Sequence, residues 1–321
     1  MKRFLSYIII LAAMQVTSTA AAETLEPLRY GDFEQWVTRD IHESGIIGGK
    51  QKNVYAIGPN MTIAGNKPYV PTGGSPWASS NVMARVAGIT KTSNAVFPDT
   101  RPEGGRCAKL TTLLEECKAL GIVNIKVMVA GSMFLGRMLE PLTSTNDPYS
   151  KMEMGVPFTK RPDALCFDYS LLIPEGNKRI YSSGFSKQRT LEGHDNAEVI
   201  ILLQRRWEDA EGNIYAKRVG TGCEILDKNT SGWVNHHHLP VHYGDITSEA
   251  YYNKYMQLIP ESHSYYARNS KGKMVPVKEV GWDAPDATPT HMIVMFSASS
   301  GEPYTGTPGL TLWVDNVALA Y

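Results

Sequence analysis

The chain has 321 residues, of which 42% are hydrophobic and 20% are charged, with 28 Gly and 19 Pro. This apolar fraction is enough for a sizeable core, so the composition excludes a disordered or collagen-like chain. Lys plus Arg and Asp plus Glu each number 32, and this balance gives no basic field for a phosphate backbone. The charges are also scattered, which argues against nucleic acid and a membrane surface as partners.

The N-terminal stretch has the order of a secretory signal peptide. Lys2 and Arg3 precede an apolar run over residues 7–14, and small residues follow up to Ala22. The apolar run is too short to span a bilayer, so no transmembrane segment is expected. A buried N-terminal helix is the alternative. We expect cleavage near Ala22 and export of residues 23–321 to the periplasm, the cell surface or the medium.

Export permits disulfides, because exported proteins fold in an oxidising compartment. The four cysteines allow three full pairings, and their spacing does not choose among them. They are Cys107, Cys117, Cys166 and Cys223. Free buried thiols are the other interpretation, since a chain of this length does not need disulfides to fold.

The predicted elements are mainly strands, marked by alternating or short continuous apolar runs. In chain order they cover residues 122–130, 164–173, 198–203, 291–296 and 310–321. Residues 113–120 fit a helix, a strand or a turn. Ser248 is a candidate cap for a helix that carries Tyr251, Tyr252, Tyr255 and Ile259 on one side.

This order of elements predicts an all-β fold, because strands and helices do not alternate as a parallel α/β sheet requires. We expect one domain over residues 23–321, a β-sandwich of the jelly-roll type with at most one or two short helices. Residues 140–156 and about 228–286 have the composition of long loop insertions.

Several short motifs resemble, in this order, the putative carbohydrate metabolism domain family of exported Bacteroidetes proteins. They are Gly31-Asp32-Phe33-Glu34, Pro76-Trp77-Ala78-Ser79-Ser80-Asn81, Gly131-Ser132-Met133-Phe134-Leu135-Gly136, Gly155-Val156-Pro157-Phe158 and Leu312-Trp313-Val314-Asp315-Asn316-Val317. The resemblance covers nearly the whole mature chain. It implies a jelly-roll fold and a role in glycan use, without specifying a reaction. Residues 235–266 depart from the pattern.

The two ends of the mature chain also resemble galactose-binding-like jelly rolls. This resemblance implies that the first and last strands are neighbours and that a structural Ca²⁺ lies beside them. Glu34 and Asp315 match the ligand positions, and Asp32 is a further candidate, because Ca²⁺ prefers carboxylate and carbonyl oxygens. Hydrogen bonds from these carboxylates to the backbone are the alternative. No other cofactor is expected, since no phosphate-binding glycine motif follows a strand.

A saccharide site needs flat aromatic rings and planar polar side chains, which match the C–H faces and hydroxyls of a sugar. Trp77 follows a Gly/Ser/Pro-rich loop with Asn81 nearby, and Trp233 and Trp282 also lie in loop-like sequence. We predict these four as ligand-binding residues. The remaining aromatic candidates are Trp36, Trp207, Trp313, Tyr169 and Tyr304, and a place in the core is the alternative for all of them.

Glycoside hydrolysis would need two carboxyls, one of them with a raised pKa. Asp168 projects from the strand face opposite Phe167, while Asp195 and Glu198 precede or begin the next strand. These three are the catalytic candidates, and solvated surface charge is the alternative. The residues His236, His238 and His242 have a spacing that invites a zinc site, although an exposed His-rich loop is favoured over it.

The sequence therefore predicts an exported, monomeric protein that binds an oligo- or polysaccharide. A glycoside hydrolase on the same scaffold and a structural or adhesive surface protein are the two alternatives, and a fold alone does not distinguish them.

Overall fold

The computed structural model describes residues 23–321 except 87, 120–122, 145, 146, 148, 177, 185 and 186. The predicted signal peptide lies outside the described residues. The described chain is all-β, as predicted, with four 3-10 turns at Gly45–Ile47, Tyr149–Lys151, Lys254–Met256 and Glu261–His263. None of its helices is both long and apolar enough to cross a membrane.

The helix expected after Ser248 is not formed, and the segment contains only the turn Lys254–Met256. Pro260 disfavours a helical conformation at the residue before it, and Met256 and Ile259 pack onto the rest of the protein. Contacts with the rest of the protein therefore hold this segment in place, and it does not form the hydrogen bonds of a helix. Residues 113–119, for which a helix was one possibility, form a strand.

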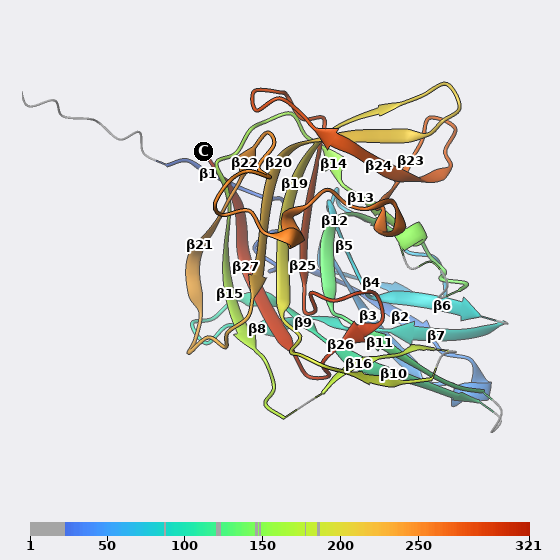
Figure 1. Ribbon diagram of the computed structural model, residues 1–321. Coiled ribbons are helices and arrows are strands. Elements are labelled where there is room, and N and C mark those ends of the chain that lie inside the picture. The colour runs from blue at the N-terminus through green and yellow to red at the C-terminus, as the bar shows by residue number, and fades with distance from the viewer. Residues whose placement is uncertain are drawn as a thin grey trace, which may run out of the picture.

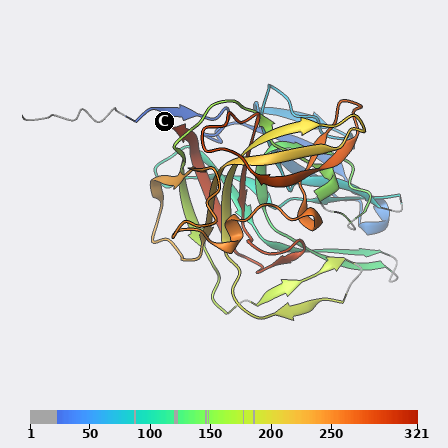
Figure 2. The ribbon, with the colours of Figure 1, turned by 45° about the horizontal axis from the view of Figure 1, so that its top comes forward.

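One sheet contains six strands in the order β21-β15-β27-β9-β8, with β1 paired to the other part of β27. Their bounds are β1 Leu25–Pro27, β8 Val96–Thr100, β9 Arg106–Thr111, β15 Ala164–Leu172, β21 Val234–Pro240 and β27 Thr311–Ala320. Leu25 lies opposite Ala320, so the first and last strands of the described chain are neighbours (Figure 2). The expectation that the first and last strands lie side by side is confirmed.

The second layer is a closed ring of seven strands in the described chain, in the order β12-β25-β19-β20-β24-β23-β13. The bounds are β12 Ser132–Met138, β13 Met152–Met154, β19 Ala197–Glu208, β20 Ile214–Leu226, β23 Tyr266–Arg268, β24 Met274–Trp282 and β25 His291–Ser297. The ring closes because β12 pairs with β25 at one end and with β13 at the other (Figure 1). The short strands β5 Trp77–Ser79, β14 Val156–Pro157 and β22 His242–Tyr243 extend its wall.

This barrel was not expected from the sequence, and the jelly-roll type of the sandwich stays a prediction. Residues 228–286, expected as a loop insertion, supply β21 to the six-stranded sheet and β23 and β24 to the barrel. Their Gly, Pro and Asn residues mark the turns between short strands, which is why the composition resembled a loop.

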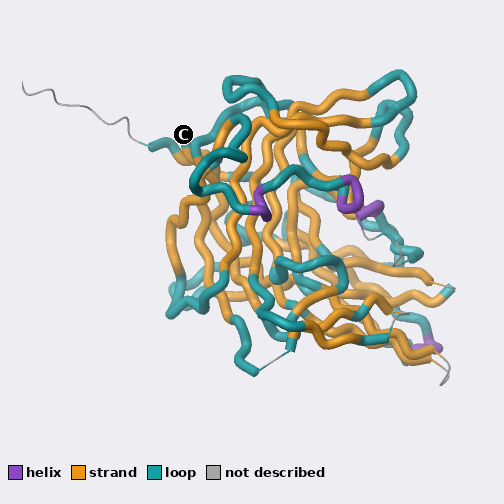
Figure 3. The backbone as a smooth tube through the Cα atoms, in the orientation of Figure 1, coloured by secondary structure: helices purple, strands orange, loops and turns teal. Residues whose placement is uncertain are grey.

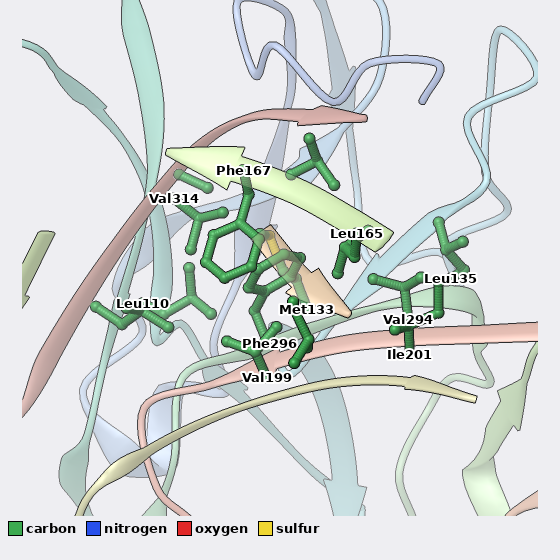
Figure 4. Close-up of a cluster of buried hydrophobic side chains, with 14 of the residues drawn as sticks. Leu110, Met133, Leu135, Leu165, Phe167, Val199, Ile201, Val294, Phe296 and Val314 are labelled. Carbon is green, nitrogen blue, oxygen red and sulfur yellow. The ribbon is translucent and has the colours of Figure 1, made fainter. Parts of the chain in front are cut away.

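A single strand, β19, contributes to two cores. Val199 and Ile201 point into the main core, which lies between the barrel wall and the six-stranded sheet (Figure 4). Ile200 and Leu202 alternate with them and point into the barrel, where they form the barrel core. The segment reads as a continuous apolar run because both of its faces are buried.

Hairpins and small sheets extend beyond one end of the barrel (Figure 3). They are β2 Trp36–His42, β3 Gln51–Ile57, β4 Met61–Ala64, β6 Val82–Val86, β7 Ile89–Ser93, β10 Leu113–Ala119, β11 Val123–Val129, β16 Arg179–Tyr181, β17 Ser183–Gly184, β18 Arg189–Leu191 and β26 Thr305–Gly306. An ion pair links the hairpins β6–β7 and β10–β11, because the ammonium of Lys91 on β7 lies 3.9 Å from the carboxylate of Glu115 on β10.

Candidate functional site

A cavity of about 490 Å³, here called the hairpin cavity, lies where the end of the barrel meets the hairpins β6–β7 and β10–β11. Most of its wall is aliphatic. Its polar end is formed by Glu198, Tyr149, Tyr265, Glu302 and Tyr304. A concave apolar site with a few convergent polar groups is the usual form of a small-molecule site.

Glu198 reaches this cavity because it is the second residue of β19. Its neighbour Val199 points into the main core, so Glu198 points to the barrel side. Ser297 on β25 lies directly opposite Glu198, and Ser132 on β12 lies opposite Ser297. All three line the cavity, so three neighbouring strands present a row of polar side chains at its end.

Burial raises the pKa of Glu198 to about 7. No residue of the described chain forms a hydrogen bond or an ion pair with its carboxyl that offsets this desolvation. Near neutral pH the carboxyl therefore exists in both forms, and it can donate or accept a hydrogen bond. A carboxyl tuned in this way inside a cavity is a recognised feature of functional sites.

Two tyrosines and a histidine form an aromatic cluster beside Glu198. The Tyr149 ring centroid lies 6.0 Å from that of Tyr265 and 6.3 Å from that of His263, both in edge-on contact. Burial raises the pKa of both tyrosines, so their hydroxyls stay protonated. The ring atom Nε2 of His263 lies 2.6 Å from Oε2 of Glu302, which ties the Glu302 loop to the turn Glu261–His263.

Asp195 lies behind the cavity wall. Its carboxylate accepts hydrogen bonds from Oγ of Ser299 at 3.0 Å and from the backbone N–H of Thr307 at 2.9 Å. Ser299 lines the cavity, whereas Asp195 is buried. Burial raises the pKa of Asp195. The structure thus brings Asp195 close to the site, where it positions Ser299.

Asp168 does not join this site. It is buried on the six-stranded sheet and accepts hydrogen bonds from Arg101 at 2.7 Å, from Asn316 at 2.8 Å and from the backbone of His236 at 2.7 Å. Burial acts to raise its pKa, but these donors hold the pKa below its ordinary value. The expectation that Asp168 faces solvent or a groove is wrong, because Arg101 covers it.

The residues predicted to hold calcium have other partners. Nη1 of Arg101 lies 2.9 Å from the carboxylate of Asp315, and Glu34 accepts the backbone N–H of Arg106 at 2.9 Å. The guanidinium thus occupies the space between Asp168 and Asp315 where a cation would bind, and the donor set does not fit a second positive charge there. In the described residues, no group of three or more His, Cys, Asp or Glu side chains is arranged to hold a metal.

Trp77 and Asn81 are structural residues, and this corrects their expected exposure. Trp77 is 1% exposed, donates its ring N–H to the carbonyl of Arg29 at 2.9 Å and packs edge-on against Phe33. The Asn81 amide bonds four backbone groups, of Tyr55, Ala95 and Val96, at 2.6–2.9 Å. Because the Trp77 ring and the Asn81 amide are buried and bonded within the protein, neither presents a surface to a sugar.

Trp233 and Trp282 lie apart from the hairpin cavity. The guanidinium of Arg101 lies 4.1 Å from the Trp233 ring centroid. Trp282 packs against the barrel core, with the buried Arg218 5.7 Å from its ring. Both rings are therefore used largely for packing against arginines. Of the aromatic candidates, Tyr304 does line the cavity.

The histidines expected near one another have separate partners. His237 contacts Glu224 at 2.7 Å, His238 contacts Glu23 at 3.2 Å, and His242 stacks on Tyr251 with the centroids 4.0 Å apart. His237 and His238 lie on the edge strand β21, whereas His242 lies on β22, which pairs with β20, so the three side chains have different partners and do not converge on one point. The four cysteines are free thiols, and Cys117 is the one that is not buried.

A further depression of about 640 Å³ lies between β2 and β8 and is lined by Trp36, Tyr55, Asp99 and Arg106 among others. Burial acts to raise the pKa of Asp99, but hydrogen bonds from Trp313 and Thr100 hold it below its ordinary value. This depression therefore lacks a carboxyl suited to proton transfer, and the hairpin cavity is the stronger candidate.

Sequence reasoning missed Tyr149, Tyr265 and Glu302 as site residues. Tyr149 comes from the turn Tyr149–Lys151, and Tyr265 and Glu302 come from two loops that are far apart in the chain. Each residue on its own is an ordinary tyrosine or a surface carboxylate. The one signal concerned Tyr265, which lies in the Tyr- and His-rich residues 235–266 that depart from the expected pattern.

The comparisons with solved structures give two proteins described as putative glycoside hydrolases. One, from Bacteroides thetaiotaomicron VPI-5482, is 17% identical, with a TM-score of 0.45, and the match covers 85% of this chain and 81% of that one. The other, from Bacteroides vulgatus ATCC 8482, is 14% identical, with a TM-score of 0.42 and coverage of 92% and 94%. No curated protein matches the chain. The model of the putative carbohydrate metabolism domain matches residues 33–320, and the chain therefore belongs to this family.

Proposed function

We propose that this protein binds a saccharide in the hairpin cavity, with Glu198 as the central hydrogen-bonding group. The observation that carries the proposal is the desolvated carboxyl of Glu198, whose pKa is raised to about 7, beside Tyr149 and Tyr265. A sugar hydroxyl both donates and accepts, and a carboxyl near its pKa can do either. Tyrosine rings supply apolar faces for sugar C–H groups and hydroxyls for the rim. Membership of a carbohydrate metabolism family supports a sugar over other polar ligands.

The test is a glycan array with the mature chain, residues 23–321, followed by calorimetry on each hit. We compare the wild type with Glu198→Gln and with a matched control, Glu211→Gln, which changes an exposed carboxylate on a turn outside the cavity. Glu198→Gln should weaken binding by about ten-fold or more, the scale of a lost hydrogen bond to a charged or strongly polar group. Equal binding by all three proteins would remove Glu198 from the site.

Hydrolysis of a glycoside is the second candidate function, favoured by the same raised pKa. Protonated Glu198 would give its proton to the glycosidic oxygen as the bond from that oxygen to the anomeric carbon breaks. A water molecule would add to the anomeric carbon and lose its proton to a second carboxylate. Glu302, which also lines the cavity and raises the pKa of Tyr149 together with Glu198, is the candidate for that role.

Release of reducing sugar from a glycan panel separates the two functions. Wild-type activity that falls at least a hundred-fold in Glu198→Gln and in Glu302→Gln, with binding retained, would support hydrolysis. Binding without release would leave the protein a binding module. Export stays part of the proposal, and N-terminal sequencing of the protein from its producing cell checks cleavage after Ala22.

A further inference from the structure

The hairpin cavity has an extensive aliphatic wall in addition to the polar end that holds Glu198. This wall is built from two hairpins, each of which presents one face of alternating residues. Along β6 and β7 these are Val82, Ala84, Val86 and Ile89, and along β11 they are Ile125, Val127 and Val129. Most of these side chains are only half-buried, so the two hairpins leave apolar surface uncovered by the described protein.

This apolar wall is continuous with the polar end that holds Glu198. Met138, Met152 and Met295 line the same cavity, and all three pack against the barrel core. Methionine is flexible and polarisable, so such a surface adapts to apolar ligands of varied shape. A single ligand can therefore contact Glu198 at one end and the valine and isoleucine side chains of the hairpins at the other.

The charged groups at the hairpin end compensate one another. The ammonium of Lys91 lies 3.0 Å from Glu43 and 3.9 Å from Glu115. Glu43 also accepts two hydrogen bonds from Thr92, at 3.0 and 2.8 Å. Lys91, the lysine at the hairpin end of the lining, is therefore already paired with carboxylates, and this argues against a fatty acid or a phosphate at this end.

We propose that the ligand of the hairpin cavity is a glycoside with an uncharged apolar aglycone, its sugar at Glu198 and its aglycone between the two hairpins. The inference rests on the proposed saccharide function and adds the class of substituent. Burial of an apolar chain against aliphatic side chains is favourable in proportion to the area removed from water. Contiguous apolar surface of this kind commonly marks a ligand site.

The test measures affinity for methyl, hexyl and octyl β-D-glucoside, below the micelle concentration, together with 1-octanol. Affinity should rise about four-fold for each added methylene, from the transfer free energy of one such group. Equal affinity for the three glucosides would overturn the apolar aglycone and leave saccharide binding standing. Equal affinity for octyl glucoside and octanol would instead show that the sugar is not recognised, and the proposed function would fail.

A pair of isosteric variants controls for non-specific contact. Val127→Thr places a hydroxyl in the apolar wall and should weaken octyl glucoside about three- to ten-fold while leaving methyl glucoside unchanged. Val70→Thr makes the same change at a side chain that is 67% exposed and lies outside the cavity, so both affinities should persist. Equal effects of the two variants would contradict the proposed location.

Cys117 provides a second readout, because this free thiol lines the hairpin cavity opposite Ile125 on the neighbouring strand. The other three thiols are buried. Alkylation of Cys117 should slow several-fold with octyl glucoside and stay unchanged with methyl glucoside, and Cys117→Ser should abolish the fast labelling. Octyl glucoside that binds without slowing the alkylation would place the aglycone elsewhere.

Discussion

Asp168 and Glu198 lie on opposite sides of the main core. Phe167, the neighbour of Asp168, and Val199, the neighbour of Glu198, both point into that core from facing sheets (Figure 4). Successive side chains of a strand point to opposite faces, so the two carboxyls point away from each other. Arg101 neutralises Asp168 on the outside of one sheet, whereas Glu198 enters the hairpin cavity from the other.

Replacement of Asp168 should therefore change stability rather than function. Asp168→Asn removes a buried charge from Arg101, and we expect the free energy of unfolding to fall by about 2–4 kcal/mol, with ligand binding intact. Because the pKa of Asp168 is below its ordinary value, its contribution to stability is present above that ordinary value and is lost as the pH falls through the folded pKa. Urea unfolding from neutral to acidic pH measures both effects. A loss of binding without a loss of stability would contradict them.

Glu198 should have the opposite linkage to pH. Its pKa is 4.5 in the unfolded chain and about 7 in the folded protein. The stability from the protonated form is fully present below the lower value and is lost as the pH rises through the upper one. Glu198→Gln cannot ionise, so at about pH 8 it should exceed the wild type by about 1–3 kcal/mol. Chemical denaturation at several pH values checks this, and parallel curves for both proteins would argue against a raised pKa.

Trp77 should be a stability residue. Trp77→Ala leaves a cavity in the main core, and we expect a loss of about 3–5 kcal/mol in unfolding free energy. Trp207→Ala is a matched control, because the Trp207 side chain is 41% exposed, and it should cost less than about 1 kcal/mol. Similar melting temperatures for the two variants would mean that the burial of Trp77 contributes little.

Removal of calcium should leave the melting temperature of the protein unchanged, because the guanidinium of Arg101 already neutralises Asp168 and Asp315. Thermal melting with and without EDTA measures this. A melting temperature that EDTA lowers and added Ca²⁺ restores would support the calcium site predicted from Glu34 and Asp315 instead.

Hydrophobic patterning by itself determined the all-β class and located several strands. The alternation of Leu165, Phe167 and Leu171 predicted β15, and the apolar runs near the end predicted β25 and β27. These predictions were correct because the alternation of buried and exposed side chains along a strand depends on a few consecutive residues and is visible in the sequence. The same pattern placed Ile125, Val127 and Val129 on one face of β11, without indicating that this face lines a cavity.

Only the tertiary structure decided the barrel and the site. The ring closes because β12 has two partners that are distant in the chain, and no local pattern specifies which strands pair. Glu198 and Asp168 differ because burial raises the pKa of Glu198, whereas the hydrogen bonds from Arg101, Asn316 and the backbone of His236 hold the pKa of Asp168 below its ordinary value. Strand formation depends on neighbours in sequence, whereas desolvation depends on neighbours in space.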